Sequence, residues 1–107
     1  MPWPLPSATS TLPGRIEMTP VKAQSVSVTD TELIVNLDDG RTVSVPLAWY
    51  PRLFYSAARE RQKWELLGQG EGIHWPDLDE DIAVAHLLAG IPSGESQHSL
   101  QRWLASR

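Results

Sequence analysis

The clearest structural pattern in the chain is the stretch VKAQSVSVTDTELIVNLDDGRTVSVPL (residues 21–47). Apolar side chains alternate with polar ones through three short runs, which is typical of strands that bury only one face. Two turn signals separate the runs, at Asp30-Thr31 and at Asp38-Asp39-Gly40, and Asp-Gly favours the tight turns of hairpins. The pattern predicts a three-stranded antiparallel meander over about residues 22–29, 32–38 and 41–46.

The residues that follow predict helices packed on this sheet. Trp49-Tyr50-Pro51 ends the third strand, and proline suits the first position of a helix. The apolar residues of 51–64 gather on one helical side, while Ser56 offers a second N-cap that would divide the segment into two short helices. A three-stranded sheet with one bare face is barely stable, so we expect helices to cover it. The expected fold class is α+β, an antiparallel three-stranded β-meander followed by short helices packing on one face.

The next stretch, WELLGQGEGIHWPDLDEDIAVAHLLAG (residues 64–90), is rich in glycine, tryptophan and carboxylates. Residues 65–67 predict a short strand, and the glycines at 68, 70 and 72 predict a bend in the chain. Residues 73–75 are expected to be extended because a proline follows them.

Two helices are predicted at the C-terminal end. The first covers 82–89, with Asp79 or Asp81 as its N-cap and Gly90 just after its last turn. The second covers 97–105, with Ser93 or Ser96 as its cap.

Length, charge and composition bound the class of protein. A chain of 107 residues predicts one domain, which we place at 21–107, after a proline-rich tail at 1–20. The net charge of −4 disfavours nucleic acid and anionic membranes as partners, since both reward clustered lysine and arginine. With no cysteine, disulfides and thiolate metal sites are excluded, which fits a cytoplasmic protein. No apolar run reaches the roughly 20 residues that a membrane-spanning helix needs.

Three motifs occur in a fixed order: RTVSVPLAWYPRL (41–53), WELLGQGEGIHWPDLDEDI (64–82) and LLAGIPSGESQHSLQRWL (87–104). Together they resemble the bacterial family called domain of unknown function 2442, over about residues 21–104. The resemblance implies a small α+β domain with no established reaction. Members often lie beside another short gene, in pairs sometimes described as toxin–antitoxin-like, which implies a small cognate protein as partner.

Two features depart from some members of that family. Some carry a C-terminal helix-turn-helix domain, whereas only about one helix is expected here after Gly94. Relatives commonly have a serine that caps the helix where this chain has Ala83, so an aspartate would have to supply that cap.

The residues that could carry chemistry lie in one short segment. They form our candidate interaction or ligand surface: His74, Trp75, Asp77, Asp79, Glu80 and Asp81. Carboxylates and an imidazole are ligands for divalent cations, but acids in the first turn of a helix equally suit its dipole. A calcium loop is rejected because an isoleucine stands where that loop needs glycine. Trp75 is expected to anchor the core with other tryptophans; the alternative, an exposed Trp75 rimmed by acids, would be typical of a binding hot spot.

Two functional hypotheses follow. The first is a non-catalytic protein-interaction or regulatory module, antitoxin-like, that binds a basic partner or forms a homodimer through an exposed strand edge. It is favoured because no nucleophile has a credible base: His98 and Ser99 are adjacent and point different ways on a helix. It requires no cofactor and no metal. The second hypothesis is a small metal-dependent enzyme or ligand-binding domain that uses His74 and the Asp77–Asp81 cluster.

Overall fold

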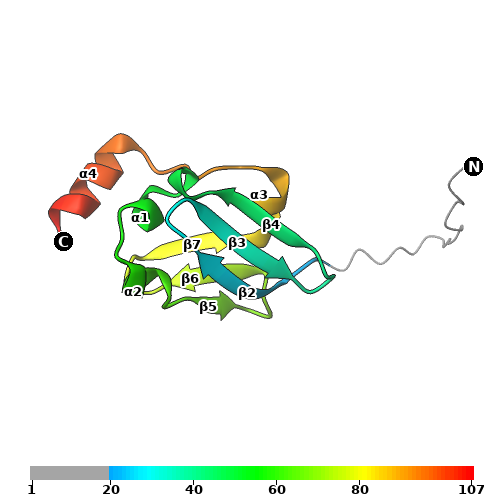
Figure 1. Ribbon diagram of the computed structural model, residues 1–107. Helices are drawn as coiled ribbons and strands as arrows, with labels where there is room; N and C mark the ends of the chain where they lie inside the picture. Colours follow the sequence, from blue (N-terminus) through cyan, green and yellow to red (C-terminus); the bar gives the residue numbers. More distant parts are fainter. Residues whose placement is uncertain (1–19) are drawn as a thin grey trace, which may run out of the picture.

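The computed structural model describes residues 20–107, so the tail predicted at 1–20 lies outside the described residues except for Pro20 (Figure 1). The predicted meander is confirmed as a first antiparallel sheet whose strands pair in chain order: β2 (Ala23–Val28), β3 (Glu32–Leu37) and β4 (Thr42–Pro46). Val26 lies opposite Val35, and both are buried. The alternation in the sequence therefore determines which face of this sheet is buried.

Three short helical pieces follow the meander: η1 (Leu47–Trp49), α1 (Pro51–Phe54) and α2 (Ala58–Arg61). Pro51 begins α1, as predicted. The division into two helices also occurs, but Ser56 does not cap α2. Its Oγ donates instead to the carbonyl oxygen of Leu53 at 2.7 Å. The N-cap is Ala57, whose backbone N–H donates to Glu60 Oε1 at 2.9 Å.

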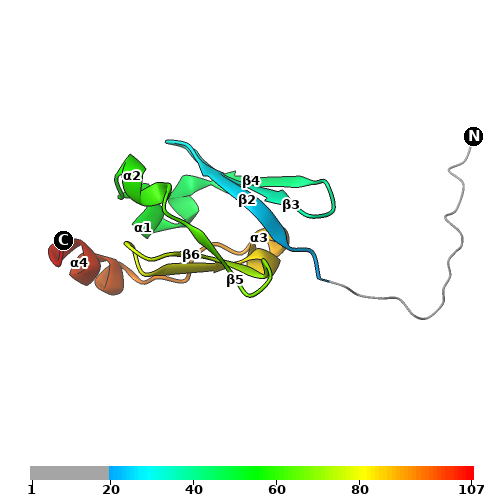
Figure 2. The same cartoon turned by 90° about the horizontal axis from the view of Figure 1, so that it is seen from below.

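A second antiparallel sheet faces the meander, and Figure 2 shows the two sheets as separate layers. Its strands also pair in chain order: β5 (Glu65–Leu67), β6 (Gly72–Trp75) and β7 (Glu80–Ala83). The core between the layers includes Leu33 and Val35 of β3 and Ile73 and Trp75 of β6, all fully buried. The α+β class is confirmed, while much of the cover that we expected from helices comes from this second sheet.

Strand β7 occupies the start of the helix that was predicted at 82–89. Helix α3 spans Val84–Ala89; its N-cap is Ala83, and no side chain caps it. The prediction of an aspartate cap is therefore wrong. The physical reason is strand pairing: Ile82 lies opposite Ile73 of β6, so the backbone groups of this segment find partners in the sheet.

The end of the first predicted C-terminal helix and the whole of the second are confirmed. Gly90 follows α3 with a left-handed φ of 73°, as a glycine after a helix commonly does. Helix α4 (Gln97–Ala105) is capped by Ser96, whose Oγ accepts a hydrogen bond from the Ser99 backbone N–H at 3.0 Å. None of the helices in residues 20–107 has the length and apolar character that a bilayer crossing demands.

Gly70 joins the two sheets at the bend that the glycines predict. Its carbonyl oxygen accepts a hydrogen bond from the Ala23 backbone N–H at 2.8 Å. Its φ is +111°, and a Cβ at this position would lie 2.6 Å from the Ala23 carbonyl oxygen. Only glycine fits this close approach, because any side chain would collide with β2.

Candidate functional site

Strand β7 divides the acidic segment between the two faces of the second sheet. Trp75 lies opposite Glu80, and His74 lies opposite Asp81. Successive side chains of a strand point to opposite faces. Glu80 therefore shares the inward face with Trp75, whereas Asp81 shares the outward face with His74. Carboxylates that are neighbours in the sequence thus lie in different surroundings.

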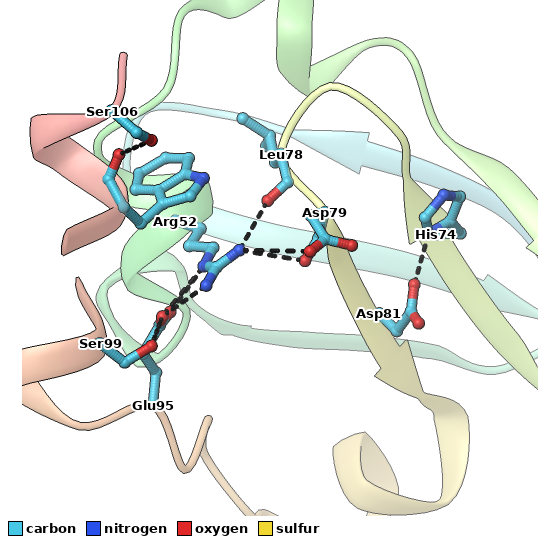
Figure 3. A network of polar contacts seen from close by, with 9 residues as sticks. Arg52, His74, Leu78, Asp79, Asp81, Glu95, Ser99 and Ser106 are labelled. Carbon is cyan, nitrogen blue, oxygen red and sulfur yellow. Dashed lines mark hydrogen bonds and ion pairs between the residues drawn. The ribbon is translucent and has the colours of Figure 1, made fainter.

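His74 and Asp81 form a side-chain pair on the outward face (Figure 3). His74 Nδ1 contacts Asp81 Oδ1, and Glu65 of β5 lies opposite His74 on its other side. The hydrogen bond with Asp81 raises the pKa of His74, and the negative charges of Asp81 and Glu65 act in the same direction. The positively charged imidazole is therefore favoured to higher pH than in a free histidine.

The turn between β6 and β7 carries the other two aspartates. Asp77 Oδ2 lies 3.3 Å from Lys63 Nζ, and both side chains are exposed. Asp79 has a left-handed φ of 52°, its side chain is 92% exposed, and its ion pair with Arg52 Nη1 is long at 3.9 Å. Exposed ion pairs contribute only about 0–1 kcal/mol, so these carboxylates remain available to a partner. We name this group of residues the acidic surface: the exposed Asp77, Asp79 and Asp81, together with the partly buried His74.

Trp75 is not part of the acidic surface. Its indole is fully buried, and its Nε1 donates to the carbonyl oxygen of Arg61 at 3.0 Å. The hypothesis of an exposed tryptophan rimmed by acids is therefore wrong. The strand alternation explains the position, because Trp75 is in phase with Ile73, which is also fully buried.

Glu80 has the most unusual surroundings of these carboxyls. It is half-buried on the inward face, and no hydrogen bond or ion pair reaches its side chain from within residues 20–107. Burial raises the pKa of Glu80 to about 7; the charge of Glu95 also raises it, and Arg52 opposes the shift. Glu80 therefore changes its charge near neutral pH, which is common for groups at binding sites.

The Glu80→Gln variant should be more stable than the wild type at pH 8 and close to it at pH 4. The folded-state pKa lies above the ordinary value of 4.5, so the stabilising contribution of protonated Glu80 is fully present below that value. It is lost as the pH rises through about 7. At pH 8 the wild type buries a charge that glutamine lacks, and partial exposure limits the expected gain to about 1–2 kcal/mol.

Urea unfolding at pH 4 and pH 8 measures this difference. Glu32→Gln is the matched control. Glu32 is exposed on the first sheet, and its substitution removes the same formal charge as Glu80→Gln. An effect of Glu80→Gln on unfolding free energy that is the same at both pH values would contradict the raised pKa of Glu80.

The acidic segment does not assemble a metal site in the described chain. Across residues 20–107, no three histidine, aspartate or glutamate side chains lie close enough together to hold a metal ion. The division by β7 supplies the reason, since Glu80 and Asp81 point to opposite faces. This geometry does not favour the metal-dependent hypothesis.

Arg52 is the centre of a hydrogen-bond network that no local sequence pattern predicts (Figure 3). Arg52 of α1 donates through Nε and Nη2 to the Glu95 carboxylate at 2.8–3.0 Å, although the two residues lie 43 positions apart. Its Nη1 donates to the carbonyl oxygens of Leu78 and Asp79 at 3.1 and 3.3 Å. Ser99 Oγ also donates to Glu95, at 2.8 Å. The network fixes the acidic turn to α1 and to the start of α4.

A family model described as "Protein of unknown function (DUF2442)" matches residues 23–93. The chain belongs to this family. The resemblance found in the sequence motifs is thereby confirmed. The region that matches DUF2442 contains the acidic surface, Glu80 and Arg52, and it ends before Glu95 and α4.

Two solved structures are similar to this DUF2442 chain. One is a crystal structure of a protein of unknown function from Rhodospirillum rubrum ATCC 11170, with 28% identity and a TM-score of 0.63, covering 74% of this chain and 98% of that one. The other is a solution NMR structure of an uncharacterized protein from Chromobacterium violaceum, with 18% identity and a TM-score of 0.59, covering 79% of this chain and 74% of that one. The second likeness shows the fold alone. A comparison with curated proteins finds no match.

Proposed function

We propose that this DUF2442 chain is a non-catalytic protein-interaction module that binds a basic partner through its acidic surface. The observation that carries the proposal is the exposure of Asp79 and Asp81, whose side chains are 92% and 66% exposed on adjoining parts of the turn and β7. Exposed carboxylates of one sign attract lysine and arginine and accelerate association with a basic protein.

The surroundings of His74 support a binding role over a catalytic one. Its ring contacts Asp81, and no serine or threonine hydroxyl within residues 20–107 hydrogen-bonds to it. A nucleophile must lie within hydrogen-bond reach of its base. The pair therefore lacks the third member that acyl-transfer chemistry needs.

The partner that we expect is a short basic protein, bound in an antitoxin-like pair in the cytoplasm. The net charge of −4 complements such a partner and would repel nucleic acid. The alternative partner is a second copy of the chain, joined through an unpaired edge of one of the sheets.

Affinity capture from the lysate of the source organism tests the proposal, with three forms of the tagged protein compared by quantitative mass spectrometry. The forms are wild type, Asp79→Asn/Asp81→Asn, and the control Glu32→Gln/Asp38→Asn, which removes two exposed charges from β3 and the turn that follows it. We expect one basic protein to be enriched with wild type and control and at least about tenfold depleted with the Asp79/Asp81 variant. Equal recovery with all three forms would refute the role of the acidic surface.

A further inference from the structure

A cavity of about 330 Å³ opens beside the acidic surface. It lies between β7, α3 and the loop after α3, and the residues around it include Tyr50, Glu80, Asp81, His86 and Ser93. Its volume is at the lower end of the range of small-ligand pockets, which suits the end of one long side chain.

The Glu80 carboxyl in this cavity lacks a partner within the described residues. The nearby cation Arg52 is already engaged, since its guanidinium donates to both oxygens of Glu95. The Tyr50 hydroxyl is also engaged, donating to the Ile91 carbonyl oxygen at 3.3 Å. A half-buried carboxylate without a partner is costly, so an incoming hydrogen-bond donor with positive charge would be favoured there.

The rest of the lining selects a cation with an apolar stem. Glu80 turns its side chain to this side of β7, and no lysine or arginine of residues 20–107 lines the cavity, so an anion would be repelled. Ile82, Ile91 and Pro92 supply apolar walls, which suit the methylene groups that lysine and arginine carry below their charged ends. Asp81 belongs both to the lining and to the acidic surface, so a chain bound along that surface passes the mouth of the cavity.

We propose that this cavity receives the cationic end of an arginine or lysine side chain from the partner, with the Glu80 carboxylate as its counter-ion. The proposal rests on the proposed function, since the same partner occupies the acidic surface. The bound cation forms a charge-assisted hydrogen bond with Glu80, while its stem packs on the apolar walls.

An NMR titration of the full chain with N-acetyl-arginine methylamide at pH 8 tests the cavity without any partner. We expect saturable shifts of the backbone amides of residues 80–86, Ile91, Ser93 and Gly94, and at least about tenfold weaker binding in Glu80→Gln. The uncharged citrulline analogue should cause no saturable shifts, and Glu32→Gln should bind as the wild type does. Equal binding by wild type and Glu80→Gln, or no saturable binding by the wild type, would overturn the proposal.

The pH dependence gives a second readout. Probe binding should weaken about tenfold from pH 8 to pH 6 as Glu80 gains its proton. The other charged or titratable groups around Glu80 are Tyr50, Arg52, Asp79, Asp81, His86 and Glu95. Because His86 also lines the cavity, the comparison is repeated in His86→Asn. Loss of the pH dependence in that variant would assign it to His86 and contradict the role of Glu80.

The captured partner separates this proposal from the proposed function. If the partner needs Asp79 and Asp81 but binds Glu80→Gln with unchanged affinity, the cavity does not hold its side chain and only this inference fails. Suppose instead that the arginine probe binds at Glu80 but the Asp79→Asn/Asp81→Asn variant captures the same proteins as the wild type. The cavity then holds a free cation, and both the acidic-surface function and the partner-side-chain assignment fail. A partner that needs Asp79 and Asp81 and also binds Glu80→Gln at least about tenfold more weakly supports both the proposed function and the cavity proposal.

Discussion

The Trp75→Ala variant is expected to lose about 4 kcal/mol of unfolding free energy, the largest loss that we predict for a single substitution. Among residues 20–107, Trp75 is the largest of the fully buried side chains, and it lies between the two sheets. Alanine removes its contacts with the core and leaves a cavity that the surrounding strands can only partly fill. Since a domain of this size is stable by only about 5–10 kcal/mol, the variant should be close to unfolding.

Urea unfolding measures this loss, and two further variants make the result specific. Trp75→Phe should be less destabilising than Trp75→Ala. In addition to the cost of its smaller ring, it should lose about 1–2 kcal/mol because the Arg61 carbonyl oxygen loses its N–H donor. Phe54→Ala removes an aromatic ring that is 42% exposed, and it should cost less than about 1 kcal/mol. A Trp75→Ala variant as stable as Phe54→Ala would contradict the buried position of Trp75.

The Arg52→Ala variant is expected to lose about 3 kcal/mol of unfolding free energy. The side chains of Arg52 and Glu95 are only 16% and 8% exposed. Removing the arginine leaves the Glu95 carboxylate largely buried without its cation, and it leaves the carbonyl oxygens of Leu78 and Asp79 without their donor. Such a half-broken buried pair costs more than an exposed one.

Chemical unfolding of Arg52→Ala, Glu95→Ala and the double variant measures the pair as a cycle, with Arg59→Ala as an exposed control. Arg52 lowers the pKa of Glu95, so the pair stabilises the fold above the ordinary glutamate pKa. That stability is lost as the pH falls through the lowered folded value, and the effect of Arg52→Ala should shrink in acid. A loss below about 1 kcal/mol at pH 7, equal to that of Arg59→Ala, would show that the network is not structural.

The first sheet could be predicted from the sequence because every local signal agrees there. Its apolar residues alternate over many positions, and the Asp38-Asp39-Gly40 turn lies between two such runs. The C-cap at Gly90 and the N-cap at Ser96 were predictable for the same reason: each depends on residues close in the sequence.

Strand β7 could not be predicted because its local signals conflict. Residues 80–83 offer only two alternations, and acids ahead of an apolar run equally favour the first turn of a helix. Pairing with β6, across the turn at residues 76–79, decides between the two. The consequence for the site is large, because the strand turns Glu80 inward and leaves Asp81 outside.

Only part of the candidate site could be predicted from the sequence. The sequence locates the carboxylates in one segment, but it does not show which of them meet solvent. For Trp75 the sequence allows either a place in the core or an exposed patch, and its alternation with the buried Ile73 decides for the core. The Arg52–Glu95 pair depends on packing between α1 and the loop before α4, which no local pattern encodes.

The most direct test of the binding role is the affinity of the purified, captured partner for wild type, Asp79→Asn/Asp81→Asn and Glu32→Gln/Asp38→Asn, measured by calorimetry at two salt concentrations. We predict that wild type and control bind alike and more weakly at high salt, and that the Asp79/Asp81 variant binds at least about tenfold more weakly at low salt. Equal affinity of all three proteins, with no dependence on salt, would show that the partner does not bind through the acidic surface.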